Sequence, residues 1–261
     1  MGPFRLYWRY AWINTKGLLQ YRLWPVQIFT SLMNTVWDFL AIFVLYWRFG
    51  ALGEWQVAHT LFAFGLGATS FGLAEWFSRG LDIFPWYIRT GAFDRVLLRP
   101  RPTILQALGE RFQLDRCGRV IVGIGCIIFA AKLVDMPWTA PGVAMVVLAV
   151  AGGWFLYTGV FTIFATISFW TIGPIQLSYM FTNHTLQYLK IPYGFFGPLV
   201  RRLLVFVFPM AVFTYFPVMS LAGLSSAYAL GFLALPVGAV FSLLGLAFWR
   251  FGVRHYHSTG S

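Results

Sequence analysis

The sequence predicts an all-α protein that crosses a membrane six times, with both termini on the cytoplasmic side. Of its 261 residues, 59% are hydrophobic and 10% are charged, whereas a soluble domain carries about 25% charged residues. An outer-membrane barrel would need alternating apolar and polar residues, but the chain has long unbroken apolar runs. Runs of this kind suit membrane helices of about 20 residues. We therefore expect a single transmembrane domain over residues 1–261.

Residues 3–22 predict a helix that lies on the membrane surface. Arg5, Arg9 and Lys16 fall within about 40° of one another on a helical wheel, and aromatic side chains occupy much of the remaining circumference. This pattern directs cations toward lipid headgroups and aromatic rings toward the apolar boundary. The alternative is a plain juxtamembrane extension.

Six apolar stretches follow, and each suits a transmembrane helix. Three glycines in the second stretch, Gly65, Gly67 and Gly72, would let neighbouring helices approach closely. The third stretch is short, and Pro209 and Pro217 interrupt the fifth. The predicted spans are residues 24–47, 57–76, 120–134, 143–170, 203–221 and 227–249.

Two longer connections separate these spans. Residues 78–119 contain eight arginines and four acidic residues, and prolines divide them into several short helices. We predict that they form a cytoplasmic loop. Residues 171–200 are too broken for a clean span and too apolar for a solvated loop, so we predict a partly re-entrant connector.

The basic residues predict the orientation. The chain has 19 Lys and Arg against 8 Asp and Glu, a formal net charge of +11. In a soluble domain this excess would suggest nucleic acid, but in a membrane protein it is typical of cytoplasmic loops. With six spans and the N-terminus inside, only Arg48 and Lys132 fall outside. We therefore expect membrane lipid, and no nucleic acid, as a partner.

One ionisable residue, Asp38, lies well inside a predicted span, and Asn34 precedes it by one helical turn on the same face. Burying a charge in hydrocarbon is costly, so this pair is a candidate for the translocation path. An interhelical hydrogen bond explains it equally well. Glu75 has Arg79 four residues later, which favours an ion pair.

Motifs for catalysis and for cofactor binding are absent from the sequence. None of the three lysines follows a glycine and precedes Ser or Thr, so there is no Walker A loop. The four histidines are scattered. Cys117 and Cys126 would lie about 13 Å apart on one helix, too far for a disulfide. We expect no catalytic residue, no metal site and no cofactor in this chain.

The centre of the 78–119 loop carries the most specific pattern. It predicts a short amphipathic helix with Phe93, Val96 and Leu97 on one face and charges on the other, suited to a groove in a soluble partner. Pro100 would stop this helix after Arg99. The alternative is a helix that lies on the lipid headgroups.

These features together resemble a known family. The order is a surface helix, two spans, an Arg-rich loop with the core Gly-x-Phe-Asp-x-x-Leu-Leu-Arg-Pro at 91–100, and four further spans. Phe-Pro at 208–209 and Tyr-Phe-Pro at 215–217 come late in the chain. Over nearly its whole length the chain resembles the permease subunits of bacterial type-2 ATP-binding cassette (ABC) exporters. The most similar branch has about this length and often pairs two permeases with one separate ATPase.

The resemblance implies partners, a location and site residues. Two permeases, identical or related, would pair in the bacterial plasma membrane, and each would receive an ABC ATPase subunit that carries ATP and Mg²⁺. The surface helix would help to hold the ATPase. The region from Pro209 through Tyr215 to Pro217 would be broken or re-entrant near the outer face, beside the translocation path. The coupling helix and its flank would comprise Phe93, Asp94, Arg95, Val96, Leu97, Leu98, Arg99 and Pro100.

Two other functions stay open at this point. A secondary transporter or channel predicts ion-driven flux without ATP that depends on Asp38. An assembly scaffold predicts that loop mutations abolish assembly and that no transport occurs. The abundant aromatic residues are compatible with lipid-like cargo, but interface anchoring and helix packing explain them equally.

Overall fold

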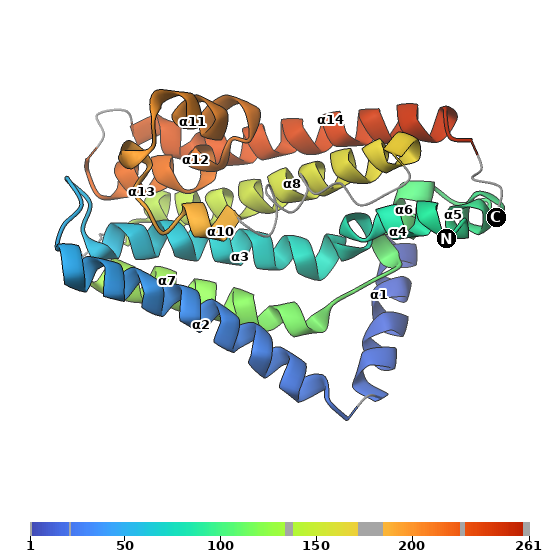
Figure 1. The fold of residues 1–261 in the computed structure, drawn as a ribbon, viewed down its shortest axis with the longest axis horizontal. Coiled ribbons are helices and arrows are strands. Elements are labelled where there is room, and N and C mark those ends of the chain that lie inside the picture. The colour runs from blue at the N-terminus through green and yellow to red at the C-terminus, as the bar shows by residue number, and fades with distance from the viewer. Residues whose placement is uncertain (1, 21, 134–137, 172–184, 225–227, 258–261) are drawn as a thin grey trace.

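A computed structural model describes residues 2–20, 22–133, 138–171, 185–224 and 228–257 (Figure 1). Within these ranges every secondary-structure element is a helix, and the only β-type pairing is an isolated bridge between Leu52 and Trp55. The predicted all-α class is therefore confirmed. Cys117 and Cys126 are both free thiols, as their spacing on one helix predicts.

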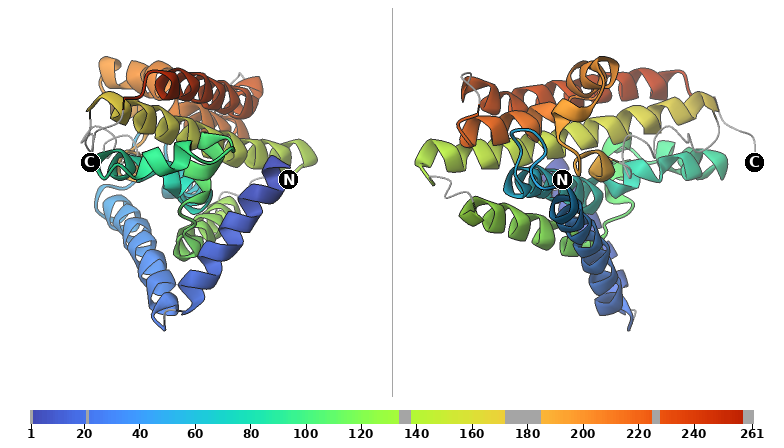
Figure 2. Two further views of the ribbon diagram at one scale, coloured as in Figure 1. Left: turned by 90° about the vertical axis from the view of Figure 1, so that its right-hand side faces the viewer. Right: turned by 60° about the vertical axis from the view of Figure 1, so that its left-hand side comes forward.

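Five long helices lie side by side along the longest axis of the molecule (Figure 1). At one end of this bundle lie three short helices and both described ends of the chain, and α1 crosses the bundle direction steeply (Figures 1 and 2). The long helices are α2 (Trp24–Phe49), α3 (Val57–Asp82), α7 (Cys117–Leu133), α8 (Ala140–Thr171) and α14 (Ala234–Arg254). The elements at the end are α1 (Pro3–Gln20), α4 (Phe84–Arg89), α5 (Ala92–Leu97) and α6 (Thr103–Gly109).

The described residues contain four helical segments long and apolar enough to cross a membrane, or five if one bent pair counts as a span. The segment corresponding to the predicted third span, α7, has 17 residues, fewer than the about 20 that a membrane requires. The six-span count and the cytoplasmic termini therefore stay predictions. The four segments are Trp24–Phe49, Val57–Arg89, Ala140–Thr171 and Tyr228–Arg254.

The bent pair is the predicted fifth span. Pro198–Val207 and Met210–Leu221 meet at 73°. The first part, α11 (Pro198–Arg202), continues into a π-helical turn, η3 (Leu203–Val207), and the Phe208 amide donates to the Leu203 carbonyl at 2.8 Å. Pro209 then ends the series of helical backbone hydrogen bonds, because proline has no amide hydrogen to donate.

The second proline interrupts the same segment at a slightly different place. The turn lies at Thr214, between α12 (Met210–Phe213) and α13 (Tyr215–Leu221). Pro217 stands in the first turn of α13, where a missing amide hydrogen costs nothing, and it cannot donate to the Phe213 carbonyl one turn earlier. The interruption therefore precedes the proline by three residues.

The predicted re-entrant connector lies mostly outside the described residues. Residues 172–184 are not among them. The remainder of 171–200 consists of short pieces: α10 (Thr185–Tyr188), η2 (Tyr193–Phe195) and the start of α11.

Helix α3 lies at the centre of the fold, with α7 and α8 packed against it. Its glycines permit this packing: a Cβ on Gly65 would lie 2.8 Å from the Gly123 carbonyl of α7, and one on Gly72 would lie 2.8 Å from the Val120 side chain. A Cβ on Gly67 would meet the Leu189 side chain. The predicted role in close helix contact is confirmed for Gly65 and Gly72, which face α7, whereas Gly67 faces the turn after α10.

Helices α8 and α14 approach each other more closely still. A Cβ on Gly238 would overlap the Gly152 carbonyl, and one on Gly245 would lie 2.9 Å from the Gly159 carbonyl. On each helix the two glycines are seven residues, or two turns, apart, so both lie on the face that contacts the other helix. We call these four glycines the glycine contact.

Candidate functional site

The predicted coupling helix forms α5, and local sequence sets its bounds. Gly91 precedes it with φ +65°, a conformation that a side chain disfavours, and this turns the chain sharply from α4 into α5. Asp94 lies in the first turn, where the helix dipole favours a negative charge. After the helix, the Gln106 side-chain amide donates to the carbonyls of Val96 (3.3 Å) and Arg101 (3.1 Å) and holds the following loop against α6.

The inner face of α5 is fixed to the ends of α8 and α14 by aromatic packing. Phe93 is fully buried, 0% exposed. Its ring centroid lies 5.1 Å from Phe84 of α4, 5.3 Å from Phe169 of α8 and 5.1 Å from Tyr256 after α14. Trp249 of α14 completes the group, 4.8 Å from Phe84. We call Phe84, Phe93, Phe169, Trp249 and Tyr256 the aromatic anchor.

Two hydrogen bonds tie the same elements together. The Tyr256 hydroxyl donates to Asp94 Oδ1 at 3.0 Å, and the Trp249 indole donates to Thr103 Oγ1 at 3.1 Å. Asp94 and Thr103 belong to the predicted cytoplasmic loop, whereas Trp249 and Tyr256 belong to the end of the last long helix and its tail. The loop is thus joined directly to α14.

The outer face of α5 and the turn after it carry side chains free to meet a partner. Leu98 is 84% exposed, and Leu97 is exposed beside it. The sequence grouped Phe93, Val96 and Leu97 on one docking face; the structure separates them, because Phe93 and Val96 point into the fold while Leu97 points out. We call the exposed group the α5 strip; it comprises Arg95, Leu97, Leu98, Arg99 and Pro100.

Helix α1 attaches to the same end of the bundle. The Tyr7 hydroxyl donates to the Phe77 carbonyl of α3 at 2.7 Å, and the Asn14 side-chain amide donates to the Gly109 carbonyl of α6 at 2.8 Å. Burial raises the pKa of the Tyr7 hydroxyl above its usual range, so this donor keeps its proton. The three predicted surface cations, Arg5, Arg9 and Lys16, are all exposed.

A network of ion pairs surrounds one buried carboxylate. Glu75 of α3 has a side chain only 1% exposed, and three guanidinium groups face it. Arg79 lies 3.3 Å from Glu75 Oε1 as predicted, Arg116 lies 3.6 Å from the same oxygen, and Arg119 of α7 pairs with Oε2. Two further acids extend the network, since Arg79 pairs with Asp82 and Arg116 with Asp115.

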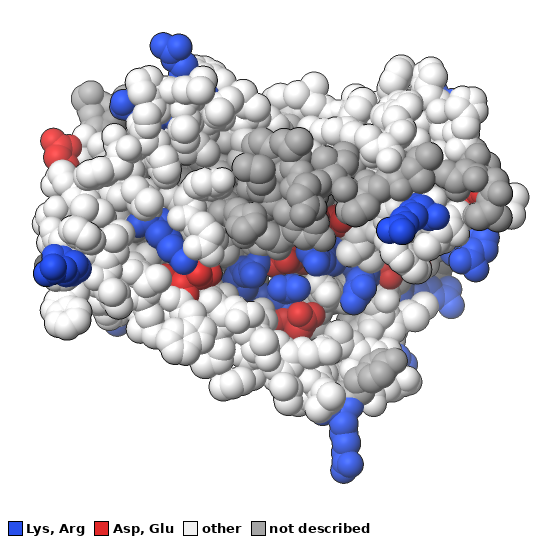
Figure 3. Space-filling view, in the orientation of Figure 1, with Lys and Arg blue, Asp and Glu red and all other residues white. Residues whose placement is uncertain are grey.

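The network continues toward the middle of α2. Lys190 Nζ lies 2.7 Å from Asp38 Oδ1, and Gln187 donates to the same oxygen at 3.4 Å. Arg119 lies within electrostatic reach of Asp38. Figure 3 shows a band of charged side chains of both signs across one face of the molecule. We call this band the charged face.

The path residues predicted in α2 do not act as one pair. Asp38 binds Lys190, whereas Asn34 lines a cleft between α1 and α2. Sequence reasoning missed Arg116, Arg119 and Lys190 as partners. Local spacing would have paired Arg119 with Asp115, one turn earlier, but Asp115 pairs with Arg116 and Arg119 reaches Glu75 across 44 residues.

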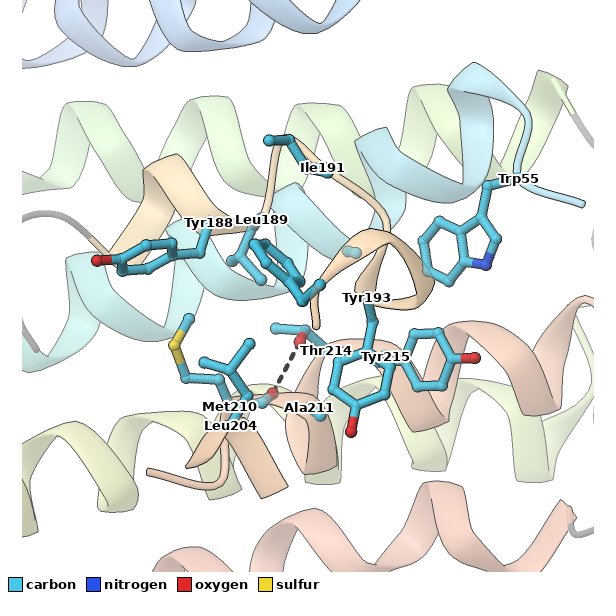
Figure 4. A pocket seen from close by; sticks show the side chains of 12 residues that line it. Trp55, Tyr188, Leu189, Ile191, Tyr193, Leu204, Met210, Ala211, Thr214 and Tyr215 are labelled. Carbon is cyan, nitrogen blue, oxygen red and sulfur yellow. Dashed lines mark hydrogen bonds between the residues drawn. The ribbon is translucent and has the colours of Figure 1, made fainter. Parts of the chain in front are cut away.

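Tyr215, predicted to lie beside the path, belongs to an aromatic group (Figure 4) on α13, at the end of the bundle opposite α5 (Figure 1). Its ring stacks on Trp55, with centroids 5.3 Å apart and planes 6° apart, and lies 4.7 Å from Tyr193. These side chains line a cavity of about 30 Å³. Such a volume holds about two water molecules, so the group forms a packed plug rather than a substrate pocket.

The aromatic anchor predicts a large effect for Phe93→Ala and a small one for Leu98→Ala. Removing the buried ring should lower the free energy of unfolding by about 3 kcal/mol, because it leaves a cavity among four other rings. Removing the exposed Leu98 side chain should change it by less than about 0.5 kcal/mol. Thermal unfolding of both variants in one detergent measures the difference. Equal shifts would contradict the assignment of the two faces of α5.

Comparison with known proteins places the whole arrangement in context. A family model described as ABC-2 family transporter protein matches residues 32–260, from the third turn of α2 to the tail after α14. Searches of curated proteins and of solved structures return no significant match. The matched region contains most of α2, the other four long helices, the α5 strip and the charged face. The chain therefore belongs to the ABC-2 family of membrane transporters.

Proposed function

We propose that this chain is the permease subunit of an ABC exporter in a bacterial plasma membrane. Family membership implies partnership with an ABC ATPase subunit and a transport role without catalysis in this chain. The observation that carries the finer proposal is the α5 strip: two exposed leucines and two exposed arginines on a helix whose opposite face is fixed by the aromatic anchor. A rigid apolar anchor with a basic surround is typical of a protein docking site.

The ATPase docks at the end of the bundle that holds α1, α4, α5 and α6. ATP and Mg²⁺ bind to that partner, and this chain supplies no cofactor site. The exposed cations of α1, Arg5, Arg9 and Lys16, lie toward lipid headgroups, and α1 supports the ATPase from the side. Closure of two ATPase subunits around ATP then moves α5, and with it α8 and α14.

The charged face is directed toward a second permease, identical or related. Charged side chains that face lipid cost several kcal/mol. The partly exposed Asp38, Arg116 and Lys190 therefore need protein or water in front of them. Two such faces opposed across a dimer would enclose a polar path, with Asn34 and Asp38 on its wall. Alternating access would open this path first to the cytoplasm and then to the outside.

The outer end of the path is closed by the plug around Tyr215. This plug lies on α13, directly after the break at Pro209 and the turn before Pro217. Because a broken helix can change direction at its break, this segment is the part of the outer end most able to move. Outward opening requires Tyr215 to separate from Trp55 or Tyr193.

Leu98→Asp tests the docking site. The variant should lower the amount of ABC ATPase that co-purifies from native membranes at least tenfold, because it puts a charge at the centre of an apolar contact. Its thermal stability should match that of the wild type, since Leu98 is exposed. The matched control is Leu224→Asp, an exposed leucine that follows α13, and it should keep the ATPase. Undiminished co-purification with Leu98→Asp would overturn the proposed docking site.

A further inference from the structure

A wide cleft separates α1 from α2. The two helices meet at one end and diverge like the arms of a V (Figure 2, left). The segment from Arg111 to Arg116 forms the third wall, and the cleft has a volume of about 980 Å³. This volume lies at the upper end of the range of about 300–1,000 Å³ that ligand pockets occupy, and it suits part of an amphiphile.

The walls of the cleft are of two kinds. Apolar side chains come from both helices: Ile13 and Leu18 from α1, and Leu23 and Val26 near the elbow. Polar side chains come from both helices and from the third wall, and they include Asn14, Gln27, Thr30, Asn34 and Gln113. Ser31 also lines the cleft, and its buried Oγ has no hydrogen-bond partner in the part of the chain that the structure describes.

The charges of the cleft leave a positive surplus. Arg111 is exposed and forms no ion pair with any described residue. Arg116 also lines the cleft, but it faces Glu75 and lies 3.4 Å from Asp115, whose carboxylate lines the cleft as well. Arg111 is therefore the one charged lining group, among the described residues, whose charge is not already matched.

We propose that this cleft binds an anionic phospholipid of the cytoplasmic leaflet, with its phosphate on Arg111 and its acyl chains along Leu23 and Val26. The proposal rests on the membrane orientation given under the proposed function, which sets α1 at headgroup depth. A soluble anion would leave the apolar walls in water. A zwitterionic lipid would bring its own cation to a site that already has a surplus of positive charge.

The test measures lipid bound to the purified full-length chain by native mass spectrometry. The probes are phosphatidylglycerol and phosphatidylcholine of the same chain length. The wild type should retain phosphatidylglycerol about tenfold more strongly, and Arg111→Gln should remove this preference, since one charge-assisted phosphate contact is lost. The matched control Arg250→Gln removes an exposed arginine at the end of α14, so the preference should persist.

A second variant tests the shape of the cleft independently of charge. Gly17 lines the cleft, and a Cβ there would meet no atom within 4 Å. Gly17→Leu fills the space, and it does not threaten α1 because leucine favours a helix more than glycine does. Binding of both lipids should fall. Full binding by Gly17→Leu would overturn the proposal.

Two further outcomes separate the possible errors. If glycerol 3-phosphate, which has no acyl chains, displaces phosphatidylglycerol at an equal concentration, the site binds a soluble anion and the lipid proposal fails. ATPase co-purification is measured on the same variants. Loss of the lipid preference in Arg111→Gln with the ATPase retained supports the proposal, whereas the ATPase failing to co-purify with the wild type contradicts the proposed function instead.

Discussion

Gly238→Leu should disrupt the packing of α8 against α14 and lower the free energy of unfolding by at least about 4 kcal/mol. A Cβ at this position overlaps the Gly152 carbonyl. If α14 moved away from α8 to make room, the close approach of Gly245 to Gly159 two turns further on would also be lost. Overpacking usually costs only about 1–3 kcal/mol, since neighbouring side chains can rotate to make room. A backbone carbonyl inside a helix cannot rotate in this way, so the cost here is larger. Thermal unfolding and the yield of monodisperse protein in detergent measure the loss.

Gly125→Leu is the matched control. Gly125 lies within α7, and a Cβ there meets no atom within 4 Å. The same substitution should therefore leave stability unchanged or raise it by up to about 1 kcal/mol, since leucine is the better helix former. If Gly238→Leu unfolds at the temperature of this control, α8 and α14 do not pack as described.

Glu75→Gln should destabilise the protein by about 3–5 kcal/mol, the cost of removing one partner from a buried ionic group. The amide keeps the size of the side chain but removes the only negative charge that Arg79, Arg116 and Arg119 share. Arg79 and Arg116 keep Asp82 and Asp115, whereas Arg119 loses its ion-pair partner. The expected result is a fall in thermal stability together with a loss of transport.

The double variant Glu75→Gln with Arg119→Gln separates charge from packing. It removes one positive charge along with the negative one, so it should be more stable than Glu75→Gln alone. Glu54→Gln, at an exposed turn, is the control and should behave as the wild type. A Glu75→Gln variant as stable as Glu54→Gln would show that the three guanidinium groups do not depend on this carboxylate.

The sequence predicts the helical class and most helix positions because apolar runs and glycines act locally. The runs set α2, α3, α8 and α14, and proline ends the η3 turn at residue 209. Span count is harder to predict, since α7 is short and the segment after Leu203 bends. Whether such pieces cross a membrane depends on neighbours that no local pattern contains.

In the candidate site, too, local patterns are predictable from the sequence and contacts between distant segments are not. The pattern at 91–100 locates a short helix, because turn chemistry is local, although α5 ends at Leu97 and not after Arg99 as predicted. It cannot tell which apolar face points inward: Phe93 is buried by Phe169 and Trp249, which lie far away in the sequence. Glu75 and Arg79 are found because they are one turn apart, whereas Lys190 reaches Asp38 across 152 residues.

In the proposed transport cycle, the aromatic anchor and the glycine contact together would make α5, α8 and α14 move as one lever. Helices locked backbone to backbone cannot slide past each other, so a push on α5 can only tilt the pair as a unit. With 21 residues, α14 is about 32 Å long, and a tilt of about 10° displaces its far end by roughly 5 Å. That displacement is comparable to the spacing of the stacked Trp55 and Tyr215 rings. In the proposed transport cycle, a modest rotation at the ATPase end of the bundle would therefore be of the size needed to separate these rings at the opposite end.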